Sequence, residues 1–253
     1  MNTKNKKSRA LLTGGMLALM CGGALAQAEM QARIAVDQAA PTATAVAPAS
    51  KDEATAAKHV NDAVAVVQKM QGEARMKDLL AQAKGIFIVP TYGRAALGVG
   101  AEGGAGVLLI KKADGAWSDP AFYNIGGLSA GAQVGVEAGA IALVLNNEKA
   151  VNKFMQKNKF AVNAAAGLTI VNWSKIAQGS LGDGDVVAWS GAKGLYGSLV
   201  SVGVNDIRYN QKLTDAYYHQ TVPVTDAVAG KYTVPASDAL KQALAAAPAM
   251  PAK

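Results

Sequence analysis

Apolar residues recur at helical spacing through residues 51–71, while charged and polar residues occupy the opposite face. A period of about 3.6 residues indicates an amphipathic helix. Its apolar face can either pack on a sheet or insert into lipid, and its modest size and alanine content favour packing. The residues of this face are Ala56, Val60, Ala63, Val64, Val67 and Met70.

A second, shorter helix is predicted over residues 73–83, with Met76 and Leu80 on its inward face. After Lys84 the pattern changes abruptly to a continuous apolar run over 86–90, followed by small and β-branched residues with frequent glycine. This change predicts the start of a sheet.

Two strand-like runs, 107–110 and 116–117, flank the pair Asp114 and Gly115. An Asp-Gly pair supplies the positive φ angles of a tight hairpin, so we expect a hairpin here. The apolar stretch 125–145 carries repeated glycines, each of which would cost a helix about 1 kcal/mol. Curved strands tolerate glycine where they bend or approach another backbone, so strands are predicted there.

A helix is predicted to begin after Asn147, with Glu148 in its first turn, and to end at Lys157. Short strands are then expected at 160–166, 168–173, 186–190, 196–204 and 232–234. The predicted fold class is α+β and mainly β. Its N-terminal amphipathic helices would pack on a glycine-rich, largely antiparallel, barrel-like sheet.

The first 26 residues have the basic start, short apolar run and small-residue end of a secretory signal peptide. Cleavage is expected after Ala26 or Ala28, which places the mature protein outside the cytoplasm. Cys21 would be removed with the leader, because Met20 precedes it where a lipidation motif requires a small residue. Residues 27–50 are predicted to be a disordered linker, 51–235 the folded domain and 236–253 a flexible tail that begins as a short helix.

The formal charge of +7 overstates the basicity of the mature chain, since the leader supplies four of the 25 basic residues and none of the 18 acidic ones. The remaining balance is 21 minus 18, or +3. A nucleic-acid-binding protein would require a clustered basic stripe, so no nucleic-acid partner is expected. Local basic clusters can still contact anionic lipid headgroups.

Each candidate enzyme motif lacks the neighbouring residues or elements that its chemistry requires. Residues 98–103 fit a glycine-rich dinucleotide fingerprint, but strand-like residues follow where the phosphate-binding helix is required. His59 and His219 lack carboxylates at metal-ligand spacing, and the acidic run at Asp183 and Asp185 lacks the other ligands of a calcium loop. We therefore expect no enzyme activity, no catalytic residue, no metal and no cofactor.

Several ordered motifs together resemble the SYLF domain, a lipid-binding module of fungal actin-patch proteins and of bacterial exported proteins. The resemblance extends over about 54–232. Its carriers are residues 83–86, the glycine-rich 98–106, the hairpin 107–120, the glycines of 126–139, the helix start 145–151 and the segment 190–197. The sequence departs from a typical member at Trp189, where a tyrosine is more usual, and in its segment 163–173, which affects local pocket details.

The resemblance implies phospholipid binding, with phosphoinositides as the eukaryotic ligands. For an exported bacterial chain, phosphatidylglycerol, cardiolipin or another anionic lipid fits better, at the periplasm or the periphery of the outer membrane. The alternative is a structural or protein-interaction module of the envelope without a lipid ligand, and protein partners stay unknown. The predicted phosphate contacts are Lys58, Lys69, Arg75, Lys77, Lys84 and Arg94, and the predicted cavity-lining residues are Trp117, Phe122 and Tyr123.

Overall fold

The computed structural model describes residues 50–177, 184–192, 195, 199 and 203–245, and within this set it leaves out the side chains of 96–99 and 129–134. The chain divides into two units, 1–48 and 49–253, and the described residues belong to the second. The N-terminal helices are α2 (Lys51–Gln71) and α3 (Met76–Gln82). The strands are β1 (Gly85–Ile110), β2 (Ala121–Leu145), β3 (Phe160–Val162), β4 (Ile170–Asn172), β5 (Val186–Ser190) and β6 (Val204–Tyr209). The remaining helices are α4 (Glu148–Lys153), α5 (Trp173–Ala177), α7 (Gln211–Tyr218), α8 (Val224–Val228), the 3-10 turn η1 (Pro235–Ser237) and α9 (Asp238–Ala245).

Helix α2 begins with a capping box at Ser50. The Ser50 hydroxyl accepts from the Glu53 backbone N–H, and the Glu53 carboxylate accepts from the Ser50 backbone N–H. Its apolar face is buried, with Val67 and Met70 fully inaccessible to solvent. This face packs on the sheet and on α9, so the prediction that it packs is confirmed. Its apolar residues are therefore not free to insert into lipid.

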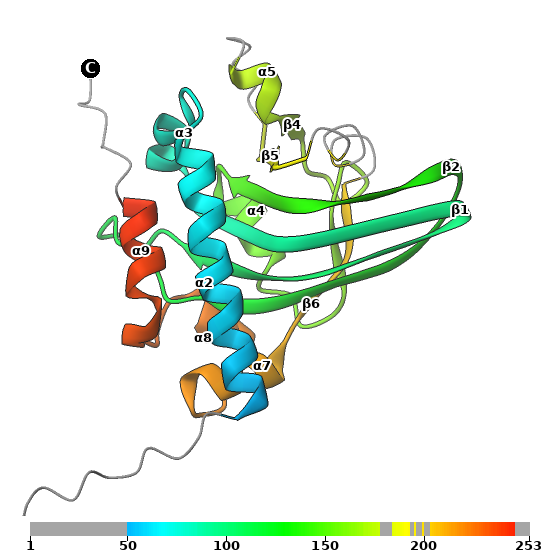
Figure 1. Ribbon diagram of the computed structural model, residues 1–253. Helices are drawn as coiled ribbons and strands as arrows, with labels where there is room; N and C mark the ends of the chain where they lie inside the picture. Colours follow the sequence, from blue (N-terminus) through cyan, green and yellow to red (C-terminus); the bar gives the residue numbers. More distant parts are fainter. Residues whose placement is uncertain (1–49, 178–183, 193–194, 196–198, 200–202, 246–253) are drawn as a thin grey trace, which may run out of the picture. The chain divides into compact units, whose positions relative to one another are not determined.

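The six described strands form a mixed, curled sheet in the order β3, β6, β2, β5, β4, with β1 paired to β2. All pairings are antiparallel except that of β4 with β5. Figure 1 shows α2 crossing one end of this sheet, with α3 and α9 beside it. The predicted fold class, helices packed on a largely antiparallel barrel-like sheet, is confirmed.

Strands β1 and β2 form one long two-stranded ribbon, which turns back on itself half way along (Figure 1). At the bend β1 advances by two residues, from Leu97 to Val99, while its partner on β2 moves from Val134 to Ala130. The extra length places β2 on the outside of the bend. The two halves then lie so close that a Cβ atom on Gly106 would stand 2.3 Å from the carbonyl oxygen of Ile88.

The turn between β1 and β2 follows the predicted hairpin chemistry. Gly115 has a φ of +82°, and the Asp114 carboxylate accepts from the Ala116 backbone N–H. Lys111 pairs with Trp117 as an isolated bridge, and β2 starts only at Ala121. The Asp-Gly pair therefore forms the turn, while the strand expected at 116–117 is reduced to one bridge.

An aromatic cluster fills the core where the ribbon meets α4 and β3. The Tyr123 ring lies 5.3 Å from that of Phe154, edge to face, and its hydroxyl donates to the Phe154 carbonyl at 2.6 Å. Phe87, Phe160 and Tyr209 complete the cluster. Edge-to-face aromatic contacts of this kind stabilise a core beyond the area they bury.

The C-terminal part differs most from the sequence prediction. Helices α7 and α8 were not predicted, and 232–234 is not a strand because its backbone leads into η1. Of the predicted strand 196–204, residues 196–198 and 200–202 lie outside the described residues, Leu199 is helical, and β6 begins only at Val204. The short helix expected at the start of the C-terminal stretch is confirmed as α9, and it is not frayed, because its Leu240 and Leu244 are buried against the core. Their spacing of four residues places both on one face of the helix.

Asp185 ties three elements together and gives a testable pH dependence. Its carboxylate accepts from the Thr169 backbone N–H, from the Asn147 amide and from Lys149, and these bonds, the backbone one first, lower its pKa to about 2. The Asp185→Asn variant should lose about 2 kcal/mol of unfolding free energy at pH 7, since hydrogen bonds to a charged group are being weakened.

The sign of the pH effect follows from the lowered pKa. The contribution of Asp185 is fully present above the ordinary carboxyl pKa near 4 and is lost as the pH falls towards 2. Urea unfolding at pH 7 and pH 3 checks this, and the difference between wild type and variant should shrink at the lower pH. A difference that is equal at both pH values would contradict the assignment.

Candidate binding groove and basic cluster

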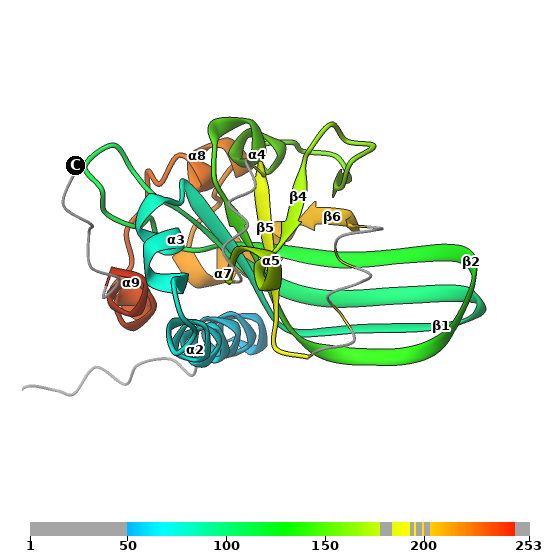
Figure 2. The ribbon, with the colours of Figure 1, turned by 90° about the horizontal axis from the view of Figure 1, so that it is seen from above.

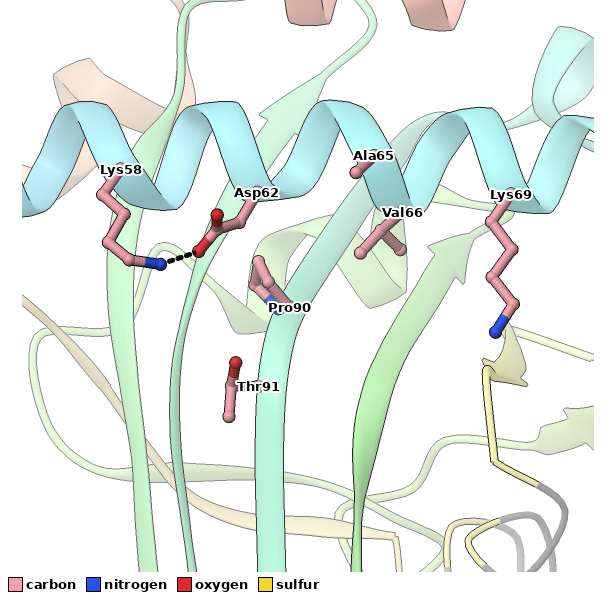
Figure 3. Close-up of a pocket in the computed structure, with 7 residues that line it drawn as sticks. All are labelled: Lys58, Asp62, Ala65, Val66, Lys69, Pro90 and Thr91. Carbon is pink, nitrogen blue, oxygen red and sulfur yellow. Dashed lines mark hydrogen bonds and ion pairs between the residues drawn. The ribbon is translucent and has the colours of Figure 1, made fainter.

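An open groove of about 440 Å³ lies between α2 and the start of the ribbon (Figure 3). Its floor is uncharged, formed by Ala65, Val66 and Pro90, with Thr91 at one side. Lys58 and Lys69 stand at opposite ends of the helical wall. Their separation of 11 residues is about 16 Å along a helix. We define these residues with Asp62 as the α2 groove.

The two lysines of the α2 groove are held differently. Lys58 donates to the Asp62 carboxylate at 2.6 Å, an exposed pair one helical turn apart. Lys69 has no carboxylate partner among the described residues. Its ammonium donates to the Gly191 carbonyl at 3.2 Å and lies 5.9 Å from the Trp189 ring. The charge of Lys69 is therefore positioned but not neutralised, and it can attract an anion.

Glu73, in the turn between α2 and α3, fixes the wall beside Lys69. Its two carboxylate oxygens accept from the indole N–H groups of Trp189, at 2.7 Å, and of Trp173. Both indoles are almost fully buried. One carboxylate thus satisfies two buried donors and joins the α2–α3 turn to β5 and α5.

The Glu73→Gln variant should be less stable than the wild type by about 2 kcal/mol, because the amide keeps one acceptor oxygen and turns its N–H₂ group towards the other indole. Urea unfolding followed by tryptophan fluorescence measures the loss. Glu148→Gln is the matched control, since Glu148 is exposed in the first turn of α4 and should cost under about 1 kcal/mol. Equal losses in the two variants would contradict the shared-carboxylate role.

A second group of cations surrounds α3. Lys77 and Lys84 are exposed, and the structure records no acidic partner for either among the described residues. Lys111 lies beside Lys84, and its ammonium donates to the carbonyls of Leu80 and Ala81 at the end of α3. Burial lowers the pKa of Lys111, and the neighbouring charge of Lys84 lowers it further. We call Lys77, Lys84 and Lys111 the α3 cluster.

The structure separates the six basic residues singled out from the sequence. Lys58 and Lys69 line opposite ends of the α2 groove, while Lys77 and Lys84 belong to the α3 cluster. Arg75 starts α3 with a φ of +63° and donates to the Ile176 carbonyl at 3.0 Å. Arg94 is different, since it is 8% exposed and lies inside the folded ribbon. A phosphate could reach Arg94 only by entering the ribbon.

The three aromatic residues expected to line a cavity lie elsewhere, and none lines the α2 groove. Phe122 packs against Tyr217 in the core, and Tyr123 is at the centre of the aromatic cluster. Trp117 lies under the α3 cluster, with the Lys111 ammonium 4.8 Å from its ring. A cation over an indole face is electrostatically favourable, so Trp117 supports the position of this charge.

Three residues that shape the site were not identified from the sequence. Pro90 and Thr91 form the sheet side of the groove, and their role depends on where α2 crosses β1. Lys111 follows an apolar run and joins the α3 cluster only through the pairing of 111 with 84. A basic residue next to a predicted turn was the available signal, and it is a weak one.

Within the described part of the chain, no three histidine, cysteine, aspartate or glutamate side chains come together in a way that could hold a metal ion. Among the same residues, no helix combines the length and the hydropathy that a bilayer-spanning helix requires. The chemistry available at the groove and the α3 cluster is that of ammonium groups beside an apolar floor.

The structural class is defined by two features. The capped helix α2 crosses one end of the curled β1–β2 ribbon, and a basic groove lies where they cross. The family model described as Ysc84, Las17-binding protein actin regulator, matches residues 126–247, from near the start of β2 to two residues past the end of α9. The resemblance to the Ysc84 (SYLF) family found in the sequence is therefore confirmed over these residues.

The curated relatives carry the same family name. Protein YSC84 of Saccharomyces cerevisiae is 30% identical over 172 residues, which cover 66% of this chain and 36% of that protein. The SH3 domain-containing YSC84-like protein 1 of Bos taurus is 26% identical over 161 residues, 62% of this chain and 47% of its own length. The human protein of that name is 32% identical over 117 residues, 45% of this chain and 32% of its own length. This chain thus spans less than half of each, and no solved structure matches it.

Proposed function

We propose that this domain binds anionic phospholipid membranes through the α2 groove and the α3 cluster, without catalysing a reaction. The observation that carries the proposal is a set of exposed ammonium groups that have no acidic partner within the described part of the chain. They are Lys69, which lines a groove with an uncharged floor, and Lys77 and Lys84 of the α3 cluster. Such a surface can take a phosphate at its charged end and the glycerol or upper acyl region along its floor.

The expected strength of binding follows from the number of charges. Each basic group near an anionic surface contributes about 1 kcal/mol. Three to five such groups give reversible attachment, and salt should weaken it because exposed charges are screened over about 8 Å at physiological ionic strength. The groove volume of about 440 Å³ is within the range of small-ligand sites.

We further propose that the membrane is that of a bacterial envelope. The basic and apolar start of the chain supports export, as does the absence of cysteine after Cys21. In that setting phosphatidylglycerol and cardiolipin supply the negative charge. Phosphoinositides, the eukaryotic ligands of the family, carry similar phosphate chemistry and serve as a comparison.

A protein-binding role is the second candidate, and the names of the relatives favour it. The family description and the yeast LAS seventeen-binding protein 3 both refer to binding of a protein. For this chain the same basic surface would then meet an acidic protein partner. Vesicle binding by the purified chain alone separates the two roles, because a surface that requires a protein partner would leave lipid vesicles unbound.

A panel of vesicles tests the proposed lipid class. Flotation of the chain from residue 27 onward would compare phosphatidylcholine vesicles with vesicles that also contain phosphatidylglycerol, cardiolipin or phosphatidylinositol 4-phosphate. We expect binding to all three anionic mixtures at equal surface charge and none to phosphatidylcholine. Binding to only one anionic lipid at equal charge would replace general electrostatic recognition with a specific headgroup site.

A further inference from the structure

At the bent end of the ribbon, apolar residues face outward and polar residues face inward, which is the reverse of an ordinary surface strand. Along this part of β2, Val136 and Ala138 face outward and are exposed, while Glu137 between them is partly buried and opposite Arg94 of β1. On β1 the same alternation exposes Ala95 and buries Arg94. The charged residues therefore point into the fold and the apolar residues point out of it.

The second layer of the ribbon repeats this arrangement. Ala101 and Leu128 are paired and exposed, whereas the next residue along β1, Glu102, is only 7% exposed. Leu128 is 84% exposed and Val136 is 82% exposed, and these are the exposed large hydrophobic side chains of the described residues. We define Ala95, Ala101, Leu128, Val136 and Ala138 as the apolar tip.

Inside the tip, hydrogen bonds join polar groups of Tyr92, Glu102 and Asn205. The Tyr92 hydroxyl donates to Glu102 at 2.8 Å, and the Asn205 backbone N–H donates to the other oxygen of that carboxylate. Burial raises the pKa of Tyr92, and the hydrogen bond to Glu102 raises it further, so the phenol stays protonated and keeps donating. The Glu102 carboxylate is thus hydrogen-bonded inside the ribbon, whereas the buried Nε of Arg94 has no hydrogen-bond partner among the described residues.

We propose that the apolar tip enters the outer part of the lipid bilayer once the basic surface has brought the domain to the membrane. This inference rests on the proposed function, because it requires the same membrane. The segments at the bend, 95–101 and 128–136, contain no charged residue. Strands that face hydrocarbon have this arrangement, with apolar side chains pointing outward and polar side chains pointing inward.

The path of β1 connects the tip to the groove. Thr91 lines the α2 groove, and Gly93 and Ala95 follow it on the outward face of the same strand. A lipid held in the groove would therefore extend along small, uncharged residues towards the tip. In Figure 2 the lowest stretch of the ribbon lies at the same level as α2, and the bent end of the ribbon points away from this helix.

The depth of insertion is limited by backbone hydrogen bonding. Beyond residues 123–125 and 141–145, the described part of β2 is paired with β1 alone, so its outer edge has no strand partner along the tip. Unpaired backbone groups are costly in hydrocarbon. The tip therefore stays near the headgroups and does not cross the bilayer.

Single-cysteine labelling tests the inference in the chain from residue 27 onward, which contains no native cysteine. An environment-sensitive nitrobenzoxadiazole probe would be attached to Leu128→Cys, to Val136→Cys and, as the matched control, to Asn152→Cys at an exposed position of α4. With phosphatidylglycerol vesicles, fluorescence at 128 and 136 should rise about threefold or more on transfer out of water. Lipids spin-labelled near the headgroup should quench it more than lipids labelled deep in the chain.

The outcomes separate the two claims. Vesicle-bound protein with no fluorescence change at 128 and 136, or with the same change at 152, would overturn tip insertion and leave membrane binding intact. A rise that depends on protein concentration without vesicles would assign the tip to a second copy of the chain. Absence of vesicle binding in flotation would remove the proposed function. The Leu128→Ser, Val136→Ser double variant should bind about tenfold more weakly while keeping its salt dependence.

Discussion

Replacing Lys69, Lys77 and Lys84 with glutamine is expected to weaken binding to phosphatidylglycerol vesicles by about 100-fold, since three groups near the surface each contribute about 1 kcal/mol. The three side chains are exposed, and their ammonium groups make no ion pair within the described residues. Glutamine keeps the length and polarity of the side chain and removes only the charge. Flotation at increasing lipid concentration gives the affinities.

A control with the same loss of charge uses the triple variant Lys153→Gln, Lys157→Gln, Lys159→Gln. These residues lie in α4 and just after it, on the far side of the domain from α2 in Figure 2. Its affinity should stay within about threefold of wild type, because distant charges are screened. Equal weakening in both triple variants would show that net charge alone attracts the protein, and that the α2 groove and the α3 cluster have no special role.

The Gly106→Ala variant is expected to lose about 3 kcal/mol of unfolding free energy, as overpacking in a tight core does. Its new Cβ would stand 2.3 Å from the Ile88 carbonyl oxygen and 2.8 Å from a methyl group of Val89. Since the nearest atom belongs to the backbone, the two halves of the ribbon would have to separate. Chemical denaturation measures the change.

Gly103→Ala provides the matched control in the same strand. Its Cβ would meet only the Ile125 carbonyl oxygen, at 3.8 Å, which is ordinary contact. Alanine there should be neutral or stabilising by up to about 1 kcal/mol, because it restricts the unfolded chain. If Gly106→Ala were tolerated as well as Gly103→Ala, the two halves of the ribbon could not pack as closely as the structure has them.

Local signals in the sequence predicted the parts of the fold that depend on neighbouring residues. The spacing of Val60, Val67 and Met70 placed the buried face of α2, and Asp114 with Gly115 placed the hairpin turn. The glycines of 125–145 argued correctly against a helix. Each of these features depends on periodicity or on backbone freedom within a few residues.

Features that depend on distant contacts were not predictable in this way. The folding of the ribbon on itself brings Gly106 to Ile88, and nothing local to either residue specifies that contact. Arg94 shows the same difficulty for the site, since a basic residue in a glycine-rich strand predicts an exposed charge, whereas the alternation along the bent ribbon turns it inward. The groove itself exists only because α2 crosses β1 at Pro90 and Thr91.

The most direct test of the central claim is equilibrium binding of the chain from residue 27 onward to phosphatidylcholine vesicles with and without phosphatidylglycerol, at low and high salt. The account predicts binding only when the anionic lipid is present, with an affinity that falls as salt rises. Equal binding to both kinds of vesicle, or no binding to either, would contradict it.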